Sequence, residues 1–370
     1  MCDVLVVGAG PAGAVCATLL ARAGARVRLL DRAVFPRDKL CGDTVNPGTM
    51  ATLERLRMAP ALETQGLPVD GMRVSGTNGL VVEGRYPAGV TGRAILRRDL
   101  DWMLLQDAVR AGAQFEAGVA VRGAVVEDDR VTGVRVGNCT LGASVTIAAD
   151  GRSSTLAFGL GLASHPAKPR RWALGAYVAQ PGRERFGEMH VRGGHYIGIA
   201  PVPGGLTNVC LVTPWEAGDA PLRDPRRAIL DVLSRDALLR DRFAGVDLAT
   251  TPAVLGPLAV DARDVTIDGL LLAGDAAGFI DPMTGDGLRF AIRGAQLVAT
   301  AALDALAHGW TGVHARLSRA RRQEFAAKWR FNRAVRALAA SRSAVAIATA
   351  GARIAPAILR RAMIYAGDCG

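Results

Sequence analysis

Asp-Val-Leu-Val-Val-Gly-Ala-Gly-Pro-Ala-Gly, residues 3–13, says most about the class of fold. Its apolar run is typical of a buried parallel strand, and residues 12–22 have the composition of the helix that follows. In such a turn Gly8 permits the sharp change of direction, Gly10 lets backbone approach a pyrophosphate, and Gly13 allows close strand–helix packing. The free N–H groups at the helix N-terminus then attract that anion.

A second apolar run, residues 26–30, ends at Asp31. This acid follows the glycines by about 20 residues, where a carboxylate can accept hydrogen bonds from a ribose. A glycine triplet alone is a weak signal in a chain rich in Ala and Gly, but here strand, helix, second strand and acid occur in the right order. The opening of the chain therefore predicts a dinucleotide-binding unit.

The composition indicates a globular protein with two interleaved domains. The chain has 370 residues, half of them apolar, and can bury a sizeable core. Its six cysteines are scattered without metal-type spacing, which predicts free thiols, a reducing cytoplasm and no metal site. We expect no signal peptide before a strand that begins at residue 3, and no stretch of about 20 residues able to span a bilayer.

The net charge of +11 raises the question of an anionic partner. A nucleic acid is not predicted, because only 5% of the residues are aromatic, too few for a base-stacking platform. Between residues 316 and 361, however, about a dozen basic residues face a single acid, Glu324. This helical region is interpreted either as a solvated face or as a peripheral contact with the inner face of a membrane.

Antiparallel strands interrupt the dinucleotide-type elements. Short alternating runs, broken by Gly, Asn and Pro, occur within residues 71–94, 119–149 and 172–213, and residues 97–111 have the pattern of an amphipathic helix. We predict an α/β fold: a discontinuous, Rossmann-like three-layer domain, an interleaved antiparallel-sheet substrate domain, and a helical C-terminus. The predicted divisions are 1–70, 95–165 and 260–310 for the first, 71–94 and 166–259 for the second, and 311–370 for the third.

Two further motifs end predicted strands. Asp275 follows the buried strand at 270–273 and is placed to accept hydrogen bonds from a polyol chain. Gly285 and Gly287 directly precede a long helix, whose N-terminus would stabilise the negative charge that a flavin ring gains on reduction, typically by about 0.3–1 kcal/mol. The second motif, residues 148–154, ends another strand and is predicted to form a wall of the cofactor groove.

These three fingerprints, in this order, resemble the flavoprotein superfamily that contains aromatic hydroxylases and geranylgeranyl reductases. The run Phe35-Pro36-Arg37-Asp38-Lys39-Leu40-Cys41-Gly42-Asp43 is similar to a Pro-Arg-x-Lys-x-Cys-Gly segment that passes beside the flavin in geranylgeranyl-reductase-like proteins. The resemblance covers residues 1–310 and implies FAD as the cofactor of the Rossmann-like domain.

Carried over residue by residue, the resemblance implies a role for each motif. The glycine turn would hold the pyrophosphate, Asp31 the adenosine ribose, Val121 the adenine, Asp275 the ribityl chain, and residues 282–288 the isoalloxazine ring. The implied cofactor-binding residues are Gly8, Gly10, Pro11, Ala12, Gly13, Asp31, Arg32, Lys39, Cys41, Gly42, Arg97, Val121, Asp150, Gly151, Gly274, Asp275, Pro282, Gly285, Asp286, Gly287 and Leu288.

The chain also departs from the family pattern. Reductases of this type often carry Tyr-x-Trp-x-Phe-Pro on the substrate sheet, whereas residues 196–201 read Tyr-Ile-Gly-Ile-Ala-Pro. Tyr196 and Pro201 are therefore predicted to line a wider or differently shaped substrate pocket. The family's Gly-Glu-Gly is Gly-Asp-Gly at 285–287, and the Trp-x-Trp-x-Ile-Pro run of halogenase relatives is missing from the sequence, so halogenation is not expected.

The leading functional hypothesis is an FAD-dependent reductase of double bonds in a prenyl or other lipid-like substrate. Cys41 is the candidate catalytic residue, as a proton donor or a contact on the ring face, with a small buried thiol as the alternative. The electron donor would be a transiently bound NAD(P)H or another external reductant, because no second glycine fingerprint is visible. Two alternatives stay open: an FAD-dependent monooxygenase acting on an aromatic or polyketide-like ring, and a non-catalytic prenyl-lipid carrier.

Overall fold

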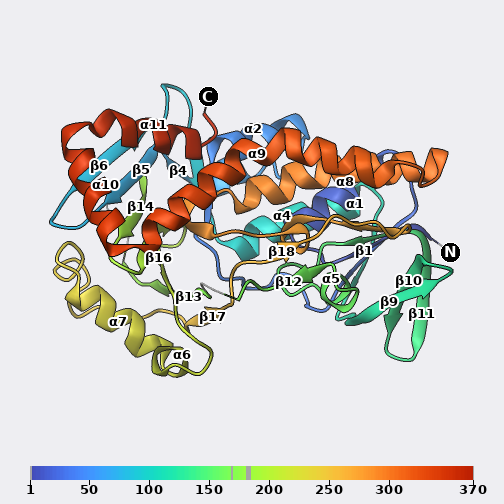
Figure 1. The fold of residues 1–370 in the computed structure, drawn as a ribbon, viewed down its shortest axis with the longest axis horizontal. Coiled ribbons are helices and arrows are strands. Elements are labelled where there is room, and N and C mark those ends of the chain that lie inside the picture. Colours follow the sequence, from blue (N-terminus) through green and yellow to red (C-terminus); the bar gives the residue numbers. More distant parts are fainter. Residues whose placement is uncertain (1, 168–169, 181–184, 370) are drawn as a thin grey trace.

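Two large β-sheets, with helices on their outer sides, form the framework of the protein. The computed structural model describes residues 2–167, 170–180 and 185–369. Figure 1 shows α8 (Gly287–His308) and α9 (Val313–Ala340) lying along each other across one side of both sheets. This arrangement is the predicted α/β fold with a helical C-terminus.

The first sheet contains the dinucleotide-type strands. In spatial order they are β8 (Gln114–Ala117), β2 (Val27–Asp31), β1 (Cys2–Val7), β11 (Cys139–Ala148), β10 (Arg130–Val136) and β9 (Val121–Glu127), with β19 (Leu270–Leu272) also paired to β11. The strands β8, β2, β1, β11 and β19 pair in parallel, and β9, β10 and β11 form an antiparallel meander. The predicted parallel β1–β2 pair is confirmed, and its apolar run is buried because helices and the meander cover both faces.

Alternation along β1 divides the core of this domain into two layers. The helices involved are α1 (Pro11–Arg22), α4 (Arg97–Arg110), α5 (Thr155–Gly159) and α8. Val4 and Val6 belong to the core cluster formed with α1, α4 and α8, whereas Leu5 and Val7 belong to the opposite cluster, with α5 and β10. The result is the three-layer arrangement expected of a dinucleotide-binding domain.

The second sheet belongs to the predicted substrate domain. In spatial order its strands are β17 (Ala253–Leu255), β13 (Trp172–Val178), β16 (Leu206–Thr213), β15 (Tyr196–Val202), β14 (Phe186–Val191), β5 (Gly71–Ser75) and β6 (Val81–Arg85). Helix α7 (Pro225–Arg235), preceded by α6 (Ala220–Arg223), covers one face through Ile229 and Leu233. Pairing is antiparallel as predicted, except that β5 and β14 run parallel, because they come from two separate excursions of the chain and no hairpin joins them.

Short elements connect the two sheets. They are β3 (Thr44–Val45), β7 (Gly92–Ala94) and β4 (Leu67–Val69) in one small sheet, the pair β12 (Ala163–Ser164) and β18 (Asp261–Ala262), helices α2 (Pro47–Arg55) and α3 (Leu62–Gln65), and the 3-10 turns η1 (Gly274–Ala277) and η2 (Pro282–Thr284). Each large sheet draws its strands from the segments predicted for its domain, while the boundaries at residues 70, 94, 165 and 259 stay a prediction.

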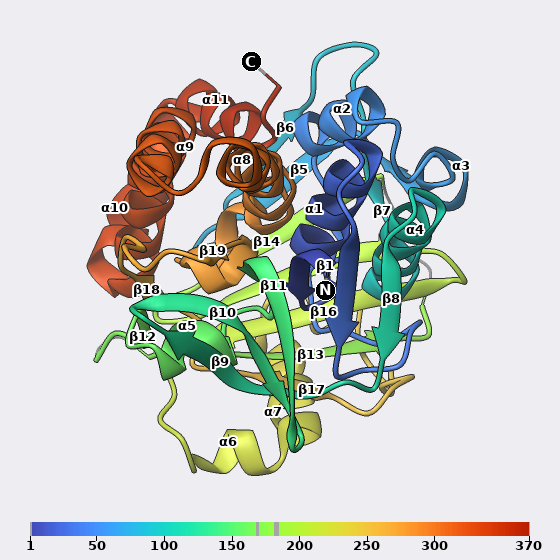
Figure 2. The same cartoon turned by 90° about the vertical axis from the view of Figure 1, so that its right-hand side faces the viewer.

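The C-terminal helices return to the substrate sheet. After α9, α10 (Arg342–Ile354) and α11 (Pro356–Ala366) form an elbow of 109° at Ala355, and α11 packs against β5 and β6. Figure 2 shows α8 to α11 gathered on one side of the molecule, away from α3 and α4. The C-terminal helices thus belong both to the dinucleotide-binding domain and to the wall of the substrate domain.

The expectation that no segment could span a bilayer is wrong by length and composition. Helix α8 is long and apolar enough to cross a membrane, and α10 and α11 pass the same test if the bent pair counts as one span. The Ala-rich α8, however, contributes Ala295, Val298 and Ala302 to the core beside α1, so its apolar character is explained by packing. The α10–α11 elbow has no such explanation, because Ile347, Ile354 and Ile358 are largely exposed.

Candidate functional site

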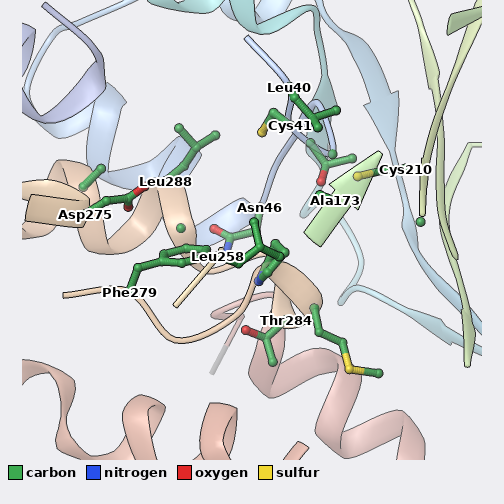
Figure 3. A pocket seen from close by; sticks show the side chains of 18 of the residues that line it. Leu40, Cys41, Asn46, Ala173, Cys210, Leu258, Asp275, Phe279, Thr284 and Leu288 are labelled. Carbon is green, nitrogen blue, oxygen red and sulfur yellow. The ribbon is translucent and has the colours of Figure 1, made fainter. Parts of the chain in front are cut away.

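A large cavity lies between the two sheets and is lined by most of the residues that the motifs predicted. Its volume is about 1320 Å³, and it extends from the first glycine turn, past the loop at 37–46 and the N-terminus of α8, to the C-terminal helices. Figure 3 shows Cys41 and Leu288, which come from distant segments, facing the same open space, with Asp275 and Phe279 nearby. The volume exceeds that of a usual small-ligand pocket and suits a dinucleotide together with a substrate.

The glycine turn has the geometry predicted for it. Gly8 adopts a φ of +100°, and a Cβ on Gly13 would overlap the carbonyl oxygen of Gly8. Gly10, the N-cap of α1, has only the guanidinium of Arg37 near its missing Cβ, at 3.6 Å, and it lines the cavity with Pro11 and Ala12. Gly8 and Gly13 are therefore required by the fold, while Gly10 leaves room for a ligand against the helix N-terminus.

Asp31 joins the end of β2 to the glycine turn. Its carboxylate accepts hydrogen bonds from the backbone N–H of Ala9 (2.7 Å) and of Ala33 (2.8 Å), and both Asp31 and its neighbour Arg32 line the cavity. Val121, at the start of β9, lines the same end. The ribose and adenine positions implied by the family resemblance thus meet at one end of the cavity.

Four of the cationic side chains that line the cavity lie near one another: Arg37, Lys39, Arg97 and Arg152. Burial lowers the pKa of Lys39, and the charges of the nearby arginines lower it further. Burial likewise raises the pKa of Asp275, although Lys39, Arg97 and Arg152 oppose that shift. A dianionic pyrophosphate would relieve the repulsion among these cations.

Unpaired polar atoms also indicate that this part of the cavity binds a polar ligand. Among the described residues, Oδ1 of Asp150 and Nε of Arg152 are buried and have no hydrogen-bond partner, and both residues line the cavity beside Gly151. Burial also raises the pKa of Asp150, since hydrogen bonds from Ser154 and the backbone only partly offset it. Buried polar groups of this kind are normally paired, so the cavity wall fits a polar ligand such as the ribose and phosphate parts of FAD.

The N-terminus of α8 opens onto the cavity as predicted. Gly285 has a φ of +71°, and Gly285, Gly287 and Leu288 line the cavity together with Pro282. Since α8 has 22 residues, its first N–H groups and dipole present partial positive charge to this region. The residues would hold the isoalloxazine ring at the end where reduction adds negative charge.

Four predicted site residues do not line the cavity. Gly13 lies behind the turn, where it serves packing, and Asp286 is fully buried on the far side, with its carboxylate 3.3 Å from Nζ of Lys328 on α9. The Tyr196 hydroxyl donates instead to Oδ1 of Asp281 (2.5 Å), because a buried hydroxyl needs a partner. Pro201 is buried in β15, and the small residues Gly198 and Ala200 line the cavity in its place.

An aspartate that the sequence did not single out fixes the candidate catalytic loop. Asp43 is almost fully buried, and its carboxylate accepts hydrogen bonds from the hydroxyl of Tyr177 (2.6 Å), the amide of Asn208 and the backbone N–H of Arg97 (3.1 Å). The Asn208 amide also donates to the carbonyl oxygen of Cys41 (2.7 Å). The half-buried Cys41 is thereby held at the cavity wall by residues of both domains.

Asp101 fixes two of the cationic side chains, as Asp43 fixes the loop that contains Cys41. Its fully buried carboxylate accepts two hydrogen bonds from the guanidinium of Arg97 (2.9 and 3.0 Å) and lies 3.1 Å from Nη1 of Arg37. Burial alone would lower the pKa of Arg97, but the adjacent Asp101 carboxylate holds that pKa well above its ordinary value. Arg97 and Arg37 are thus fixed at the cavity, a signal visible in the sequence only as the i, i+4 spacing of Arg97 and Asp101.

Beyond the flavin end the cavity becomes apolar. Its walls there come from β5, β14 and the helices α9 to α11, and the lining includes Val74, Leu80, Val191, Val335, Val345 and Met363. No pattern in the sequence indicated that the C-terminal helices would close the substrate site. They do so because α10 and α11 pack back onto the edge of the second sheet.

Comparison with known proteins now identifies the family. The profile described as FAD binding domain matches residues 1–332. The chain belongs to this family. It is an FAD-dependent oxidoreductase, as the motifs predicted, and the residues at the cavity wall fit the cofactor.

Similar proteins include reductases of lipid-like molecules. A menaquinone reductase from Mycolicibacterium smegmatis is 33% identical over 317 residues, which span 80% of this chain and 75% of that protein. A digeranylgeranylglycerophospholipid reductase from Methanosarcina mazei is 28% identical over 330 residues, or 84% of this chain and 77% of that protein. Both similarities therefore cover much more than the dinucleotide-binding motifs.

Solved structures establish the fold. A geranylgeranyl bacteriochlorophyll reductase-like protein from Thermoplasma acidophilum has a TM-score of 0.79 at 22% identity, covering 93% of this chain and 89% of that one. The flavin-dependent halogenase CmlS has a TM-score of 0.77 at 23% identity, covering 87% of this chain and 62% of that one. Reductases and halogenases share this framework, so the chemistry must be argued from the site.

The pH dependence of stability provides a test of the Asp43 network. Burial raises the pKa of Asp43 to about 6 from its ordinary 3.8, against the opposing hydrogen bonds from Tyr177 and Asn208. Between about pH 4 and 6 the folded state therefore binds more protons than the unfolded state, and the free energy of unfolding falls as pH rises. A tenfold change in an acid dissociation constant corresponds to about 1.4 kcal/mol.

Asp43→Asn, which keeps the size of the side chain, is expected to remove this contribution to the slope. The measurement is urea unfolding of both proteins from pH 4 to pH 7, because titration of the other groups cancels in the difference between them. Identical slopes in the two proteins across this range would show that Asp43 does not titrate as described.

Proposed function

We propose that the protein is an FAD-dependent reductase that reduces double bonds of a prenyl or other lipid-like substrate. The observation that supports this most directly is the apolar part of the cavity, which continues from the flavin end to the C-terminal helices. Such a site removes a long hydrocarbon substrate from water. It offers few polar groups that could orient a charged substrate. Two relatives are named as reductases of menaquinone and of digeranylgeranylglycerophospholipid, and these names also favour a lipid-like substrate.

When bound, FAD supplies the hydride, after reduction by an external donor such as a transiently bound NAD(P)H. The N-terminus of α8 would stabilise negative charge at one end of the ring, and Leu288 would contact its face. Cys41, held by Asn208 and Asp43, is the proposed source of the proton that completes reduction of a double bond. The apolar walls would exclude water from the reacting carbons.

The monooxygenase alternative is favoured by one feature of the cavity. Gly198 and Ala200 stand where related reductases carry Trp and Phe, and a Cβ on Gly198 would meet no atom closer than 3.9 Å. The space freed beside the flavin end could take a fused aromatic ring. A hydroxylase consumes dioxygen in step with product, whereas a reductase needs none, so oxygen dependence separates the two.

The test is single-turnover oxidation of the photoreduced enzyme under anaerobic conditions. We expect detergent-dispersed isoprenoid quinones or prenyl lipids to reoxidise the flavin without oxygen, whereas phenols should not. Flavin reoxidation only when oxygen and a phenol are both present would favour the monooxygenase. A protein that takes up no FAD, and so stays colourless, would favour the non-catalytic carrier.

Gly198→Trp is expected to fill the wall beside the flavin end and to slow this anaerobic reoxidation by at least about tenfold, because the added ring displaces substrate. FAD content should be unchanged, since Gly198 belongs to the substrate sheet and the pyrophosphate cradle belongs to the other domain. Unchanged reoxidation in the variant would place the substrate elsewhere.

We further propose that the protein resides in the cytoplasm and works at the inner face of the membrane, where a lipid-like substrate resides. The basic C-terminal region supports this, because anionic lipids attract clustered arginines. Helices α10 and α11 present part of this charge on their exposed sides.

A further inference from the structure

An apolar stripe crosses the outer side of the α10–α11 elbow. Ile347 and Ile354, seven residues apart on α10, are 72% and 87% exposed, and Ile358 on α11 is 71% exposed. Residues spaced by seven lie on the same helix face, and Ala350 and Gly351 between them are also exposed. Exposed isoleucines grouped in this way are unusual for a free surface, because their burial against apolar material would be favourable.

The stripe coincides with the mouth of the cavity. Ile354 and Ile358 flank the bend at Ala355, and both line the cavity although they are largely exposed. A hydrocarbon chain that enters between them would pass directly to the apolar wall formed by Val345 and Met363. The elbow is therefore one place at which the cavity meets the outside of the protein.

The charge of the segment that carries the stripe is of one sign. Residues 325–367 contain eight basic residues and no acid. Six of the basic side chains are exposed: Arg330, Arg333, Arg342, Arg353, Arg360 and Arg361. An apolar stripe flanked by arginines, on helices that lie across the surface, has the composition of a segment that rests in a membrane interface.

The elbow is attached to the substrate domain. A guanidinium N–H of Arg353 donates to the carbonyl oxygen of Asn78 (2.6 Å), and one of Arg360 donates to that of Glu83 (3.1 Å). The bend of 109° makes the two helices unsuited to cross a bilayer as one straight span, but lets both lie flat on it.

We infer that the α10–α11 elbow docks on an anionic phospholipid bilayer and admits the substrate from the lipid between Ile354 and Ile358. The inference rests on the proposed function, since a lipid-like substrate is what such a mouth would take. Ile347 inserts among the acyl chains without lining the cavity, and Arg361 meets lipid phosphates. The substrate then reaches the flavin without crossing water.

The test is flotation of the FAD-loaded full chain with vesicles of phosphatidylcholine, with and without phosphatidylglycerol. We expect binding to the anionic vesicles that weakens as salt is raised. Ile347→Asp should reduce this binding by at least about tenfold, because it removes the burial of one isoleucine, and Arg361→Gln should reduce it by about fivefold. Val109→Asp on α4 is the matched control, because Val109 is 50% exposed and the substitution also replaces an exposed aliphatic side chain by a carboxylate. This variant should bind the vesicles as the unaltered protein does.

Flotation that is equal for Ile347→Asp and Val109→Asp, or absent with both kinds of vesicle, would overturn the inference. A dimer in solution that Ile347→Asp dissociates would assign the stripe to a second copy of the chain and would also overturn it. Anaerobic flavin reoxidation by detergent-dispersed substrate is measured in parallel. If reoxidation survives without flotation, the docking surface fails and the proposed function stands. Flotation without reoxidation would support the docking surface and contradict the proposed function.

Discussion

Gly10→Ala is expected to abolish retention of FAD while leaving the apoprotein folded. Gly10 has a φ of −69°, which alanine adopts readily, and the nearest atom to the added methyl group is 3.6 Å away on Arg37. The methyl group occupies the space through which a pyrophosphate reaches the N-terminus of α1. Loss of two charge-assisted hydrogen bonds, about 1.5–3 kcal/mol each, predicts FAD affinity lower by about a hundredfold or more.

FAD fluorescence titration of the apoprotein measures this effect, and circular dichroism reports the melting temperature. Gly13→Ala provides the contrast, because its methyl group would overlap the Gly8 carbonyl and should destabilise even the apoprotein, by about 1–3 kcal/mol. Gly294→Ala within α8 is the control, because a Cβ at this position would meet no atom outside its own helix within 4 Å. This substitution should lower neither the FAD affinity nor the melting temperature. Tight FAD binding by Gly10→Ala would move the pyrophosphate away from this turn.

Asp101→Ala is expected to lower the free energy of unfolding by about 3–5 kcal/mol, because it leaves the buried guanidinium groups of Arg97 and Arg37 without their shared anion. FAD binding should weaken as well, since both arginines line the cavity. Urea unfolding of the apoprotein gives the first effect and FAD titration the second.

Asp99→Ala, on the same helix, is the matched control. The Asp99 carboxylate is 43% exposed and lies 3.8 Å from the guanidinium of Arg98, so its loss should cost no more than about 1 kcal/mol. Equal destabilisation by the two substitutions would show that the Asp101 network contributes no more than an exposed ion pair does.

Several of the predicted site residues that line the cavity belong to local motifs. Gly8 and Asp31 each lie where a strand ends, and a strand followed by a glycine turn and a helix can be recognised from local composition alone. The N-terminus of α8 is marked instead by the glycines at 285 and 287. The predicted wall at Asp150 and Gly151 also follows this rule, because it ends β11, the neighbour of β1.

Two predicted site residues that do not line the cavity depend on partners far along the chain. Asp286 contacts Lys328, 42 residues along the chain, and Tyr196 contacts Asp281, 85 residues along the chain. No local sequence pattern predicts either contact. Likewise, the Asp43 carboxylate gathers hydrogen bonds from β13 and β16 of the other domain. Each is a case of a buried polar group pairing with whatever donor or acceptor the packing brings near.

Dinucleotide binding could be inferred from the residues alone, because glycine spacing, strand ends and a following acid are local constraints that backbone geometry imposes. The position of the last helices could not, since they fold back as the wall of an apolar cavity and leave Ile354 and Ile358 at its mouth. Helical periodicity shows which residues share a face. Whether that face meets a sheet, a substrate or a lipid depends on contacts between segments hundreds of residues apart.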